Sequence, residues 1–337
     1  MRHLVVHRAG PGATVQDLGR TGHLAQGLSR GGALDRLAIH EGAVLLGQSP
    51  QLAAVEMIGA GIQCEVTEPV RIALTGAPME VHAGDRTLAW QASHLLLPGV
   101  RLTIGRPLAG RVGYLHFGGG IEVPLVLGGR ATHLTAGLGA ALAPGDVLPI
   151  GTDTGGRIGL GLAVADRFSG GILRLMPSIQ TALFPAELRA RFKAGTFRPD
   201  PRSNRMALRL MGEREGFGLS EGLSIVSEGI APGDVQITGD GVPVILLAEC
   251  QTTGGYPRIA SVLPADLPKA VQTPAKAKLT FSFLSWKEAC TAQEAADKAQ
   301  AALPRRIKPL IRSPETIADL LRYRLVDGAV TGQEDEI

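Results

Sequence analysis

The amino-acid sequence predicts a mainly β fold of two barrel-like units with a few peripheral helices. Glycine occurs 45 times and proline 22 times in 337 residues, whereas glycine usually makes up only about 7% of a chain. Short apolar runs separated by Gly or Pro recur along the chain, which is typical of strands joined by tight turns. The length favours about two domains, and the hydrophobic share of 45% is enough to build their cores.

Charge and composition exclude several classes of partner. The net charge of +3 comes from 34 basic and 31 acidic residues that are well mixed, so no polybasic patch is expected. Aromatic residues make up only 4%, which argues against base stacking and therefore against nucleic acid. Cys64, Cys250 and Cys290 are too few and too widely spaced for a disulfide framework or a metal site. From the cysteines we expect a reduced, cytoplasmic protein without a metal. No apolar run reaches the roughly 18 residues of a membrane helix, so we expect no membrane span.

Taken in order, the chain begins with a short strand at 4–6. Asp35 should cap a helix whose apolar periodicity stops at Gly47. Strands follow at 55–58, 62–66, 70–74, 88–90, 95–97 and 102–104. The polar, glycine-rich stretch 143–157 is the best boundary, and beyond it we expect strands at 173–176 and 205–210, a short helix at 185–193, and two helices at 286–303 and 313–321. These features divide the chain into units 1–165 and 166–285 and a helical tail, 286–337.

The stretch 251–257 (Gln-Thr-Thr-Gly-Gly-Tyr-Pro) follows the buried strand at 242–248. It therefore brings amide, hydroxyl and phenol groups to one sheet edge, and Gln251, Thr253 and Tyr256 are candidate catalytic residues. Gly254 and Gly255 would let the backbone approach a ligand or adopt positive φ. The alternative is an ordinary hairpin turn, which the glycine pair fits equally well.

A second polar motif lies near the N-terminus, at 14–20. Gln16, Asp17 and Arg20 could converge beside a turn at Gly19, as an amide, a carboxylate and a guanidinium. The alternative is an internal ion pair between Asp17 and Arg20. The two interpretations are compatible, because Asp17 could orient Arg20 towards a substrate carboxylate.

The glycine loop before the first helix is a candidate anion site. Ser29 and Gly32 precede the helix start, where backbone N–H groups can bind a carboxylate or phosphate. An ordinary capped helix is the alternative. Glu56 lies in an apolar segment, so it either needs a cation, for which Arg20 or Arg130 is available, or faces water at a strand edge.

Charged and titratable residues elsewhere give weaker signals. Arg205 and Arg209 lie four apart in a predicted strand, so both would project from one face and could clamp an anion. Solvent-facing charges are the alternative. His116 and His133 are isolated histidines on apolar segments, which are more often core residues than general bases. No Walker or dinucleotide motif is present, and no Met-Lys dipeptide that would carry biotin.

Two long motifs and several shorter ones together resemble a bacterial family called allophanate hydrolase subunit 2, biotin-dependent carboxyltransferase subunit, or the C subunit of 5-oxoprolinase. The similar segments are 14–20, 118–124, 127–132, 203–206 with 209–210, 227–230 with 232–233, 251–260 and 265–267. The resemblance spans about residues 2–285. At the glycine loop the family usually has Ser-Gly-Ala-x-Asp, whereas this chain has Arg-Gly-Gly-Ala-Leu-Asp at 30–35.

The resemblance implies two tandem cyclophilin-like β-barrels and action with other subunits. In one branch, the implied activity is ATP-dependent opening of 5-oxoproline to L-glutamate, with a KipI-like B subunit of 5-oxoprolinase and a LamB/YcsF-type A subunit. In another, a fused pair moves the carboxyl group of carboxybiotin, carried on a separate protein, to urea nitrogen. A third interpretation is a non-catalytic antagonist of a kinase inhibitor. The length of the chain favours the oxoprolinase branch.

In the family setting, each candidate residue has a role. Gln16 and Gln251 would form hydrogen bonds with the substrate amide, and Thr253 and Tyr256 would supply hydroxyls. Arg20 or Arg205 would bind the anionic group of the substrate. The opening motif should therefore lie close to 251–256 in the folded chain.

Overall fold

The computed structural model describes residues 2–212, 216–217 and 225–311. The prediction of a mainly β fold is confirmed, because strands dominate and the helices are few. The first part of the chain forms the N-terminal unit, with twelve strands and one α-helix. Its strands are β1 (His3–Ala9), β2 (Thr14–Gln16), β3 (Ala54–Ile58), β4 (Ile62–Val66), β5 (Val70–Gly76), β6 (Met79–Ala83), β7 (Arg86–Thr87), β8 (Ala92–Leu96), β9 (Leu102–Pro107), β10 (Val112–Phe117), β11 (Val147–Pro149) and β12 (Leu160–Leu162).

The second group of strands forms the barrel, which also carries a two-stranded ribbon. Its strands are β13 (Gly171–Met176), β14 (Phe197–Pro199), β15 (Ala207–Gly212), β16 (Glu228–Gly229), β17 (Asp234–Ile237), β18 (Pro243–Leu246), β19 (Thr253–Gly254), β20 (Arg258–Val262) and β21 (Leu279–Phe283). One more strand, β22 (Ile307–Pro309), follows near the end of the described chain.

The helices lie between and outside these strands. They are α1 (Arg36–Leu46), α2 (Ala186–Ala194), α3 (Leu267–Gln272) and α4 (Trp286–Ala301), with 3-10 turns η1 (Leu24–Gln26), η2 (Thr181–Leu183), η3 (Pro264–Asp266) and η4 (Leu303–Arg306). As predicted, Asp35 caps α1 by accepting the N–H of Ala38, and Gly47 ends it in the left-handed conformation. The helix predicted at 313–321 lies outside the described residues. None of the described helices is long and apolar enough to cross a membrane.

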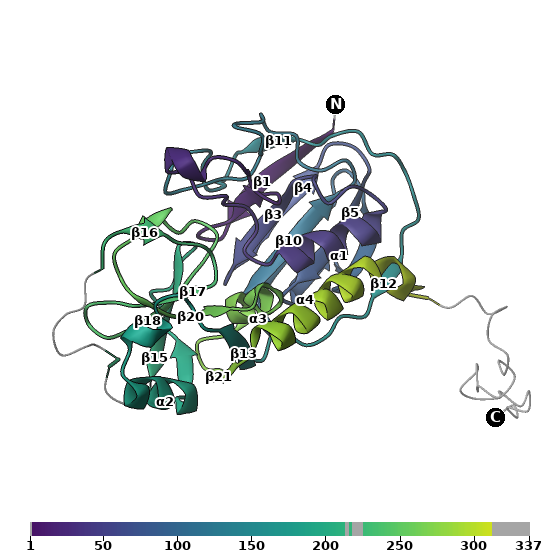
Figure 1. The fold of residues 1–337 in the computed structure, drawn as a ribbon. Coiled ribbons are helices and arrows are strands. Elements are labelled where there is room, and N and C mark those ends of the chain that lie inside the picture. The colour runs from purple at the N-terminus through teal and green to yellow at the C-terminus, as the bar shows by residue number, and fades with distance from the viewer. Residues whose placement is uncertain (1, 213–215, 218–224, 312–337) are drawn as a thin grey trace, which may run out of the picture.

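Strand order shows how the two parts differ. The N-terminal unit consists of a six-stranded sheet, β11-β1-β4-β9-β6-β7, and a seven-stranded sheet, β2-β3-β10-β5-β8-β12-β22. One core of aliphatic side chains from both sheets fills the space between them. The second part is a closed barrel in the order β13-β20-β17-β18-β15-β14-β21, flanked by the ribbon β16-β19. Figure 1 shows the barrel beside the N-terminal sheets, with α4 starting at the barrel near β13 and running below α1 towards β12.

The end of the described chain returns to the N-terminal unit. The capping box of Ser285 and Glu288 starts α4, and after η4 the strand β22 pairs antiparallel with β12. The apolar pattern predicted helices here but no strand. Three residues at the edge of a sheet are too few to give a period-two pattern.

The core of the barrel continues into the N-terminal unit. Ile39 of α1 and Tyr114 of β10 belong to the same buried cluster as Leu173, Val235 and Ile245 of the barrel. Because a continuous apolar cluster leaves no solvated plane between the two parts, we expect them to move as one body.

Buried polar contacts fix the same junction. Arg167, in the connection between β12 and β13, donates to Asp35 and to Glu41, each at 2.8 Å. Gln272 of α3 donates to Asp35 and to the carbonyl of Val112, both at 2.8 Å. The guanidinium of Arg167 thus lies against two carboxylates away from water, and the amide of Gln272 adds a further hydrogen bond to one of them. Buried charges need such partners to offset the loss of water.

His116 is a core residue of β10. Its Nε2 lies 2.8 Å from the hydroxyl of Thr75, and that hydroxyl donates to the carbonyl of Ala38, so the ring is the donor. The ring packs on Gly42, where an added Cβ would lie 2.3 Å from it. Burial lowers the pKa of His116 to about 3.

This burial predicts a loss of stability in mild acid. Below its ordinary pKa of 6.5, His116 takes up a proton only in the unfolded chain, until the pH reaches about 3. The free energy of unfolding should therefore fall by about 1.4 kcal/mol per pH unit from this residue. Between pH 7.5 and 5.0, urea unfolding should show about 2 kcal/mol more loss for the wild-type chain than for His116→Gln. Parallel losses in the two proteins would contradict the assignment.

Candidate functional site

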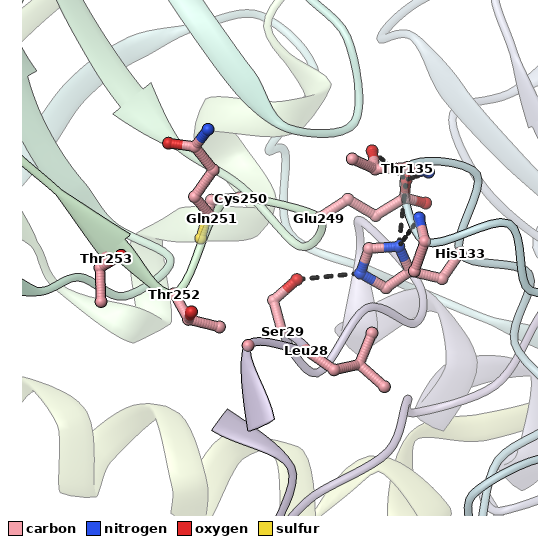
Figure 2. Close-up of a pocket in the computed structure, with 11 residues that line it drawn as sticks. Leu28, Ser29, His133, Thr135, Glu249, Cys250, Gln251, Thr252 and Thr253 are labelled. Carbon is pink, nitrogen blue, oxygen red and sulfur yellow. Dashed lines mark hydrogen bonds and ion pairs between the residues drawn. The ribbon is translucent and has the colours of Figure 1, made fainter. Parts of the chain in front are cut away.

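A cavity of about 380 Å³ lies where the N-terminal unit meets the barrel. Three segments that are far apart in the sequence form its walls: 27–29 and 133–136 from the N-terminal unit, and 249–253 from the barrel. Figure 2 shows Ser29 and His133 facing one another, with Thr252 and Thr253 opposite Ser29. The lining residues are Gly27, Leu28, Ser29, His133, Thr135, Ala136, Glu249, Cys250, Gln251, Thr252 and Thr253.

Local backbone structure explains why these segments reach the cavity. Gly27 ends η1 in the left-handed conformation, at φ 80°. The turn after His133 closes by two backbone hydrogen bonds between His133 and Leu138. The third segment leaves the buried strand β18, and the N–H of Gly31 donates to the carbonyl of Ala248 at 3.1 Å. This last contact brings the 27–33 loop against the barrel wall.

The polar groups at the cavity include a serine, a histidine and a carboxylate. The hydroxyl of Ser29 lies 2.9 Å from Nε2 of His133. Glu249 accepts the N–H and the hydroxyl of Thr135, each at 3.3 Å. Burial lowers the pKa of His133, although the Glu249 carboxylate opposes this shift. Burial raises the pKa of Cys250 to about 12, so its thiol stays protonated at neutral pH.

Arg205 binds both units from a buried position behind this cavity. It donates to Glu56 of β3 and to Glu249 after β18, and its remaining nitrogen donates to the carbonyl of Gly32 at 2.6 Å. Tyr114 also donates to Glu56, at 2.6 Å. The expectation that Arg20 or Arg130 pairs with Glu56 is therefore wrong, because Arg205, 149 positions further along the chain, pairs with Glu56 instead.

The predicted clamp of Arg205 and Arg209 does not form. Arg205 precedes β15, so the two residues do not share a strand face. Arg209 pairs instead with the exposed Asp240 at 3.2 Å. Each nitrogen of Arg205 donates to a protein acceptor, and the side chain is buried and is not among the lining residues, so it is not placed to bind a substrate anion.

The opening motif supports the cavity wall and does not line the cavity. Gln16 donates to the carbonyl of Thr132 at 3.0 Å, and Asp17 accepts the N–H of Arg130 at 2.6 Å. Arg20 donates to the carbonyls of Val126, Gly129 and Ala131. All three residues are buried. They hold the backbone of 126–132, the segment that delivers His133 to the cavity.

The suggested ion pair between Asp17 and Arg20 does not form, since each side chain is committed to backbone groups. Nor does Arg20 reach the cavity as a cation for a substrate. Burial lowers the pKa of Arg20, against the attraction of Asp17 and Glu249.

The predicted anion site at the start of α1 is filled by the protein itself. The N–H of Leu34 donates to the carboxylate of Glu56 at 2.8 Å, and Asp35 caps the helix. Gly32, with φ 81°, lets this loop cross Gly19 so closely that an added Cβ would lie 2.5 Å from the Gly19 nitrogen. Of the residues predicted in this loop, only Ser29 faces the cavity.

The stretch 251–256 reaches the cavity with its first residues only. Gln251, Thr252 and Thr253 line it, whereas Tyr256 lies outside it and is 46% exposed. Neither Gly254 nor Gly255 has positive φ. Gly254 is required for packing, because an added Cβ would lie 2.7 Å from the amide of Gln236. The predicted proximity of the two motifs is therefore indirect, through His133 and Glu249.

Sequence reasoning placed His133 in the core and did not single out Thr135 or Glu249. Two signals were present: Glu249 and Cys250 come directly after the buried strand and before Gln251, and His133 directly follows the glycine-rich motif 127–132. In the described part of the chain, no three His, Cys, Asp or Glu residues gather in a way that could hold a metal.

The chain matches a known domain family over most of its length. The sequence model described as carboxyltransferase domain, subdomain A and B, matches residues 26–283. The chain is therefore a member of the carboxyltransferase domain family, and the resemblance inferred from its motifs is confirmed.

Two curated relatives match nearly their full length. The chain is 34% identical over 296 residues to the 5-oxoprolinase C subunit of Escherichia coli, covering 86% of this chain and 94% of that protein. It is 32% identical over 281 residues to the 5-oxoprolinase C subunit of Haemophilus influenzae, covering 82% and 90%. Both relatives are named as a subunit of 5-oxoprolinase.

Solved structures share the fold. TTHA0988 superposes with a TM-score of 0.77 at 27% identity, over 84% of this chain and 56% of that one. The urea amidolyase of K. lactis superposes with a TM-score of 0.79 at 23% identity, over 93% of this chain and 21% of that one. The chain thus spans about half of the first protein and a fifth of the second.

Removing Arg205 should destabilise the chain. In Arg205→Ala, the buried Glu56 and Glu249 lose their shared cation, and breaking such a buried pair costs about 3–5 kcal/mol. Urea unfolding of the purified chain measures the loss. Arg209→Ala is the matched control, because its ion pair is partly exposed and should contribute less than about 1 kcal/mol. Equal effects of the two substitutions would contradict this account.

Proposed function

We propose that the chain is the C subunit of an ATP-dependent 5-oxoprolinase, which opens 5-oxoproline to L-glutamate. The observation that carries the proposal is the match to two 5-oxoprolinase C subunits over at least 90% of their length. The partners that we propose are a KipI-like B subunit and a LamB/YcsF-type A subunit. ATP is bound by the complex, and this chain has no motif that assigns the nucleotide to it.

The cavity suits the amide group of such a substrate. Hydroxyls of Ser29 and Thr252 and the amide of Gln251 can bind a carbonyl oxygen and an N–H group. Neither Lys nor Arg is among its described lining residues. The substrate carboxylate would therefore be met by a cation of another subunit, in keeping with a chain that acts only in a complex.

A second candidate is transfer of a carboxyl group from carboxybiotin to a urea-like nitrogen. The family match and the 25% identity to the urea amidolyase of Lachancea kluyveri favour it. That match covers only 17% of the larger enzyme, so biotin and its carboxylation would come from other proteins. The site requirements are similar, since both reactions orient a planar amide.

The purified chain should show no turnover by itself. Co-expressed with the two other subunits, it should give ATP hydrolysis that depends on 5-oxoproline, with glutamate as the product. The measurement is coupled ADP release together with glutamate quantification, and a complex that lacks this chain is the control.

Two outcomes would overturn the oxoprolinase proposal. One is full activity of the single chain. The other is an inactive three-subunit complex, coupled with biotin-dependent urea carboxylation when a biotin carboxylase and its carrier are supplied.

A further inference from the structure

Ser29 and His133 form a buried pair on one wall of the cavity. Their side chains come from different segments, and 2.9 Å separates the hydroxyl oxygen from Nε2 (Figure 2). Ser29 is 4% exposed and His133 is 3% exposed. A serine hydrogen-bonded to a histidine at a cavity invites comparison with a nucleophile and its base, and the hydrogen bond at the other ring nitrogen decides whether that interpretation holds.

The ring's other nitrogen accepts a hydrogen bond. The backbone N–H of Ala136 points at Nδ1 of His133 over 3.2 Å, and a backbone N–H can only donate. The proton of the neutral ring is therefore on Nε2, where it is donated to Ser29. Burial lowers the pKa of His133 and so keeps the ring neutral near pH 7.

Glu249 does not reverse this assignment. Its nearer oxygen is 3.8 Å from Nδ1, which exceeds hydrogen-bond distance. Its carboxylate is also held by Arg205 and Thr135. A catalytic serine would need Nε2 of the histidine to accept its proton while a carboxylate accepts a hydrogen bond from an N–H at Nδ1, and neither condition is met.

The hydroxyl proton of Ser29 is thus left for another acceptor. Its oxygen accepts from His133, and no protein acceptor for its own proton is present in the described ranges. Threonine hydroxyls of Thr252 and Thr253 lie on the opposite side of the cavity (Figure 2). A small carbonyl compound between them would satisfy that proton.

We propose that Ser29 is a hydrogen-bond donor to an amide carbonyl oxygen of the ligand in this cavity. His133 is the residue that positions the Ser29 hydroxyl, and it is not a general base. The identity of the ligand as a lactam rests on the proposed function, whereas the donor geometry rests on the contacts of His133 alone.

The proton on His133 can be located directly. In the full chain labelled with ¹⁵N-histidine, NMR at pH 7.5 should show a neutral ring protonated at Nε2. His133→Gln identifies the signal by its loss, and His82→Gln, at an exposed position in β6, should remove a different one. A ring protonated on Nδ1, or a charged ring, would overturn the proposal whatever reaction the complex catalyses.

The same sample tests the donor role. Titration with 2-pyrrolidinone, the lactam without a carboxylate, should shift the His133 signal in a saturable way. Ser29→Ala should weaken this binding by about tenfold, the effect of one hydrogen bond, while His82→Gln leaves it unchanged. Binding that is absent from the wild-type chain, or unaffected by Ser29→Ala, would remove the proposal.

Kinetics of the assembled complex separate a donor from a nucleophile. For Ser29→Ala, we expect KM to rise by about tenfold with little change in kcat, because a ground-state contact is lost. His133→Gln keeps a donor near the Nε2 position and should retain more affinity than His133→Asn. A fall in kcat of about a thousandfold or more for Ser29→Ala, or an adduct of a fluorophosphonate on Ser29, would establish a nucleophile instead.

The two proposals fail in different ways. A wild-type complex that does not open 5-oxoproline but takes part in biotin-dependent urea carboxylation contradicts the proposed function, and the NMR experiments on the single chain still decide the role of Ser29. A ring with its proton on Nδ1 contradicts the donor role and leaves the oxoprolinase assay untouched.

Discussion

The geometry of the cavity depends on one buried cation, Arg205. Its guanidinium joins Glu56 of the N-terminal unit to Glu249 of the barrel and also binds the carbonyl of Gly32. Two carboxylates in a dry junction would repel one another, so the cation between them decides whether the junction can close. Since Glu249 lines the cavity and Gly32 lies three residues after Ser29, the same contact sets how far apart the two walls stand.

The polar motifs that are most visible in the sequence act one layer behind the ligand. Gln16, Asp17 and Arg20 bind backbone groups of 126–132, and that segment fixes the start of the His133 turn. A guanidinium that binds three carbonyls makes a loop rigid at little entropic cost, because its donors are planar and fixed. The motif thus supports the site without touching the substrate. Its amide, carboxylate and guanidinium are also the groups expected in a catalytic site, and for this reason the sequence predicted a catalytic role.

The fold class, the capped helix α1 and the carboxyltransferase family followed from the sequence because each has a local signal. Glycine and proline punctuation marks strands, and Asp35 with Gly47 marks the helix ends. Partners across the junction have no such signal: the pairing of Glu56 with Arg205 depends on how two units dock. For the same reason the sequence predicted Arg20 and Arg205 as cations that bind the substrate, whereas in the structure both donate to buried acceptors of the protein.

This arrangement constrains what the chain can contribute to a reaction. Its described cavity lining offers hydroxyls, an amide, a neutral imidazole and a carboxylate already held by Arg205, so it can orient a planar amide but supplies no positive charge to an anion. Orientation by fixed neutral dipoles lowers a barrier by reducing the reorganisation needed at the transition state. Activation of an amide carbonyl by ATP, or delivery of a carboxyl group, needs charge stabilisation as well. On the proposed function, that charge must be brought by another subunit, and the open face of the cavity is where the two sets of groups would meet.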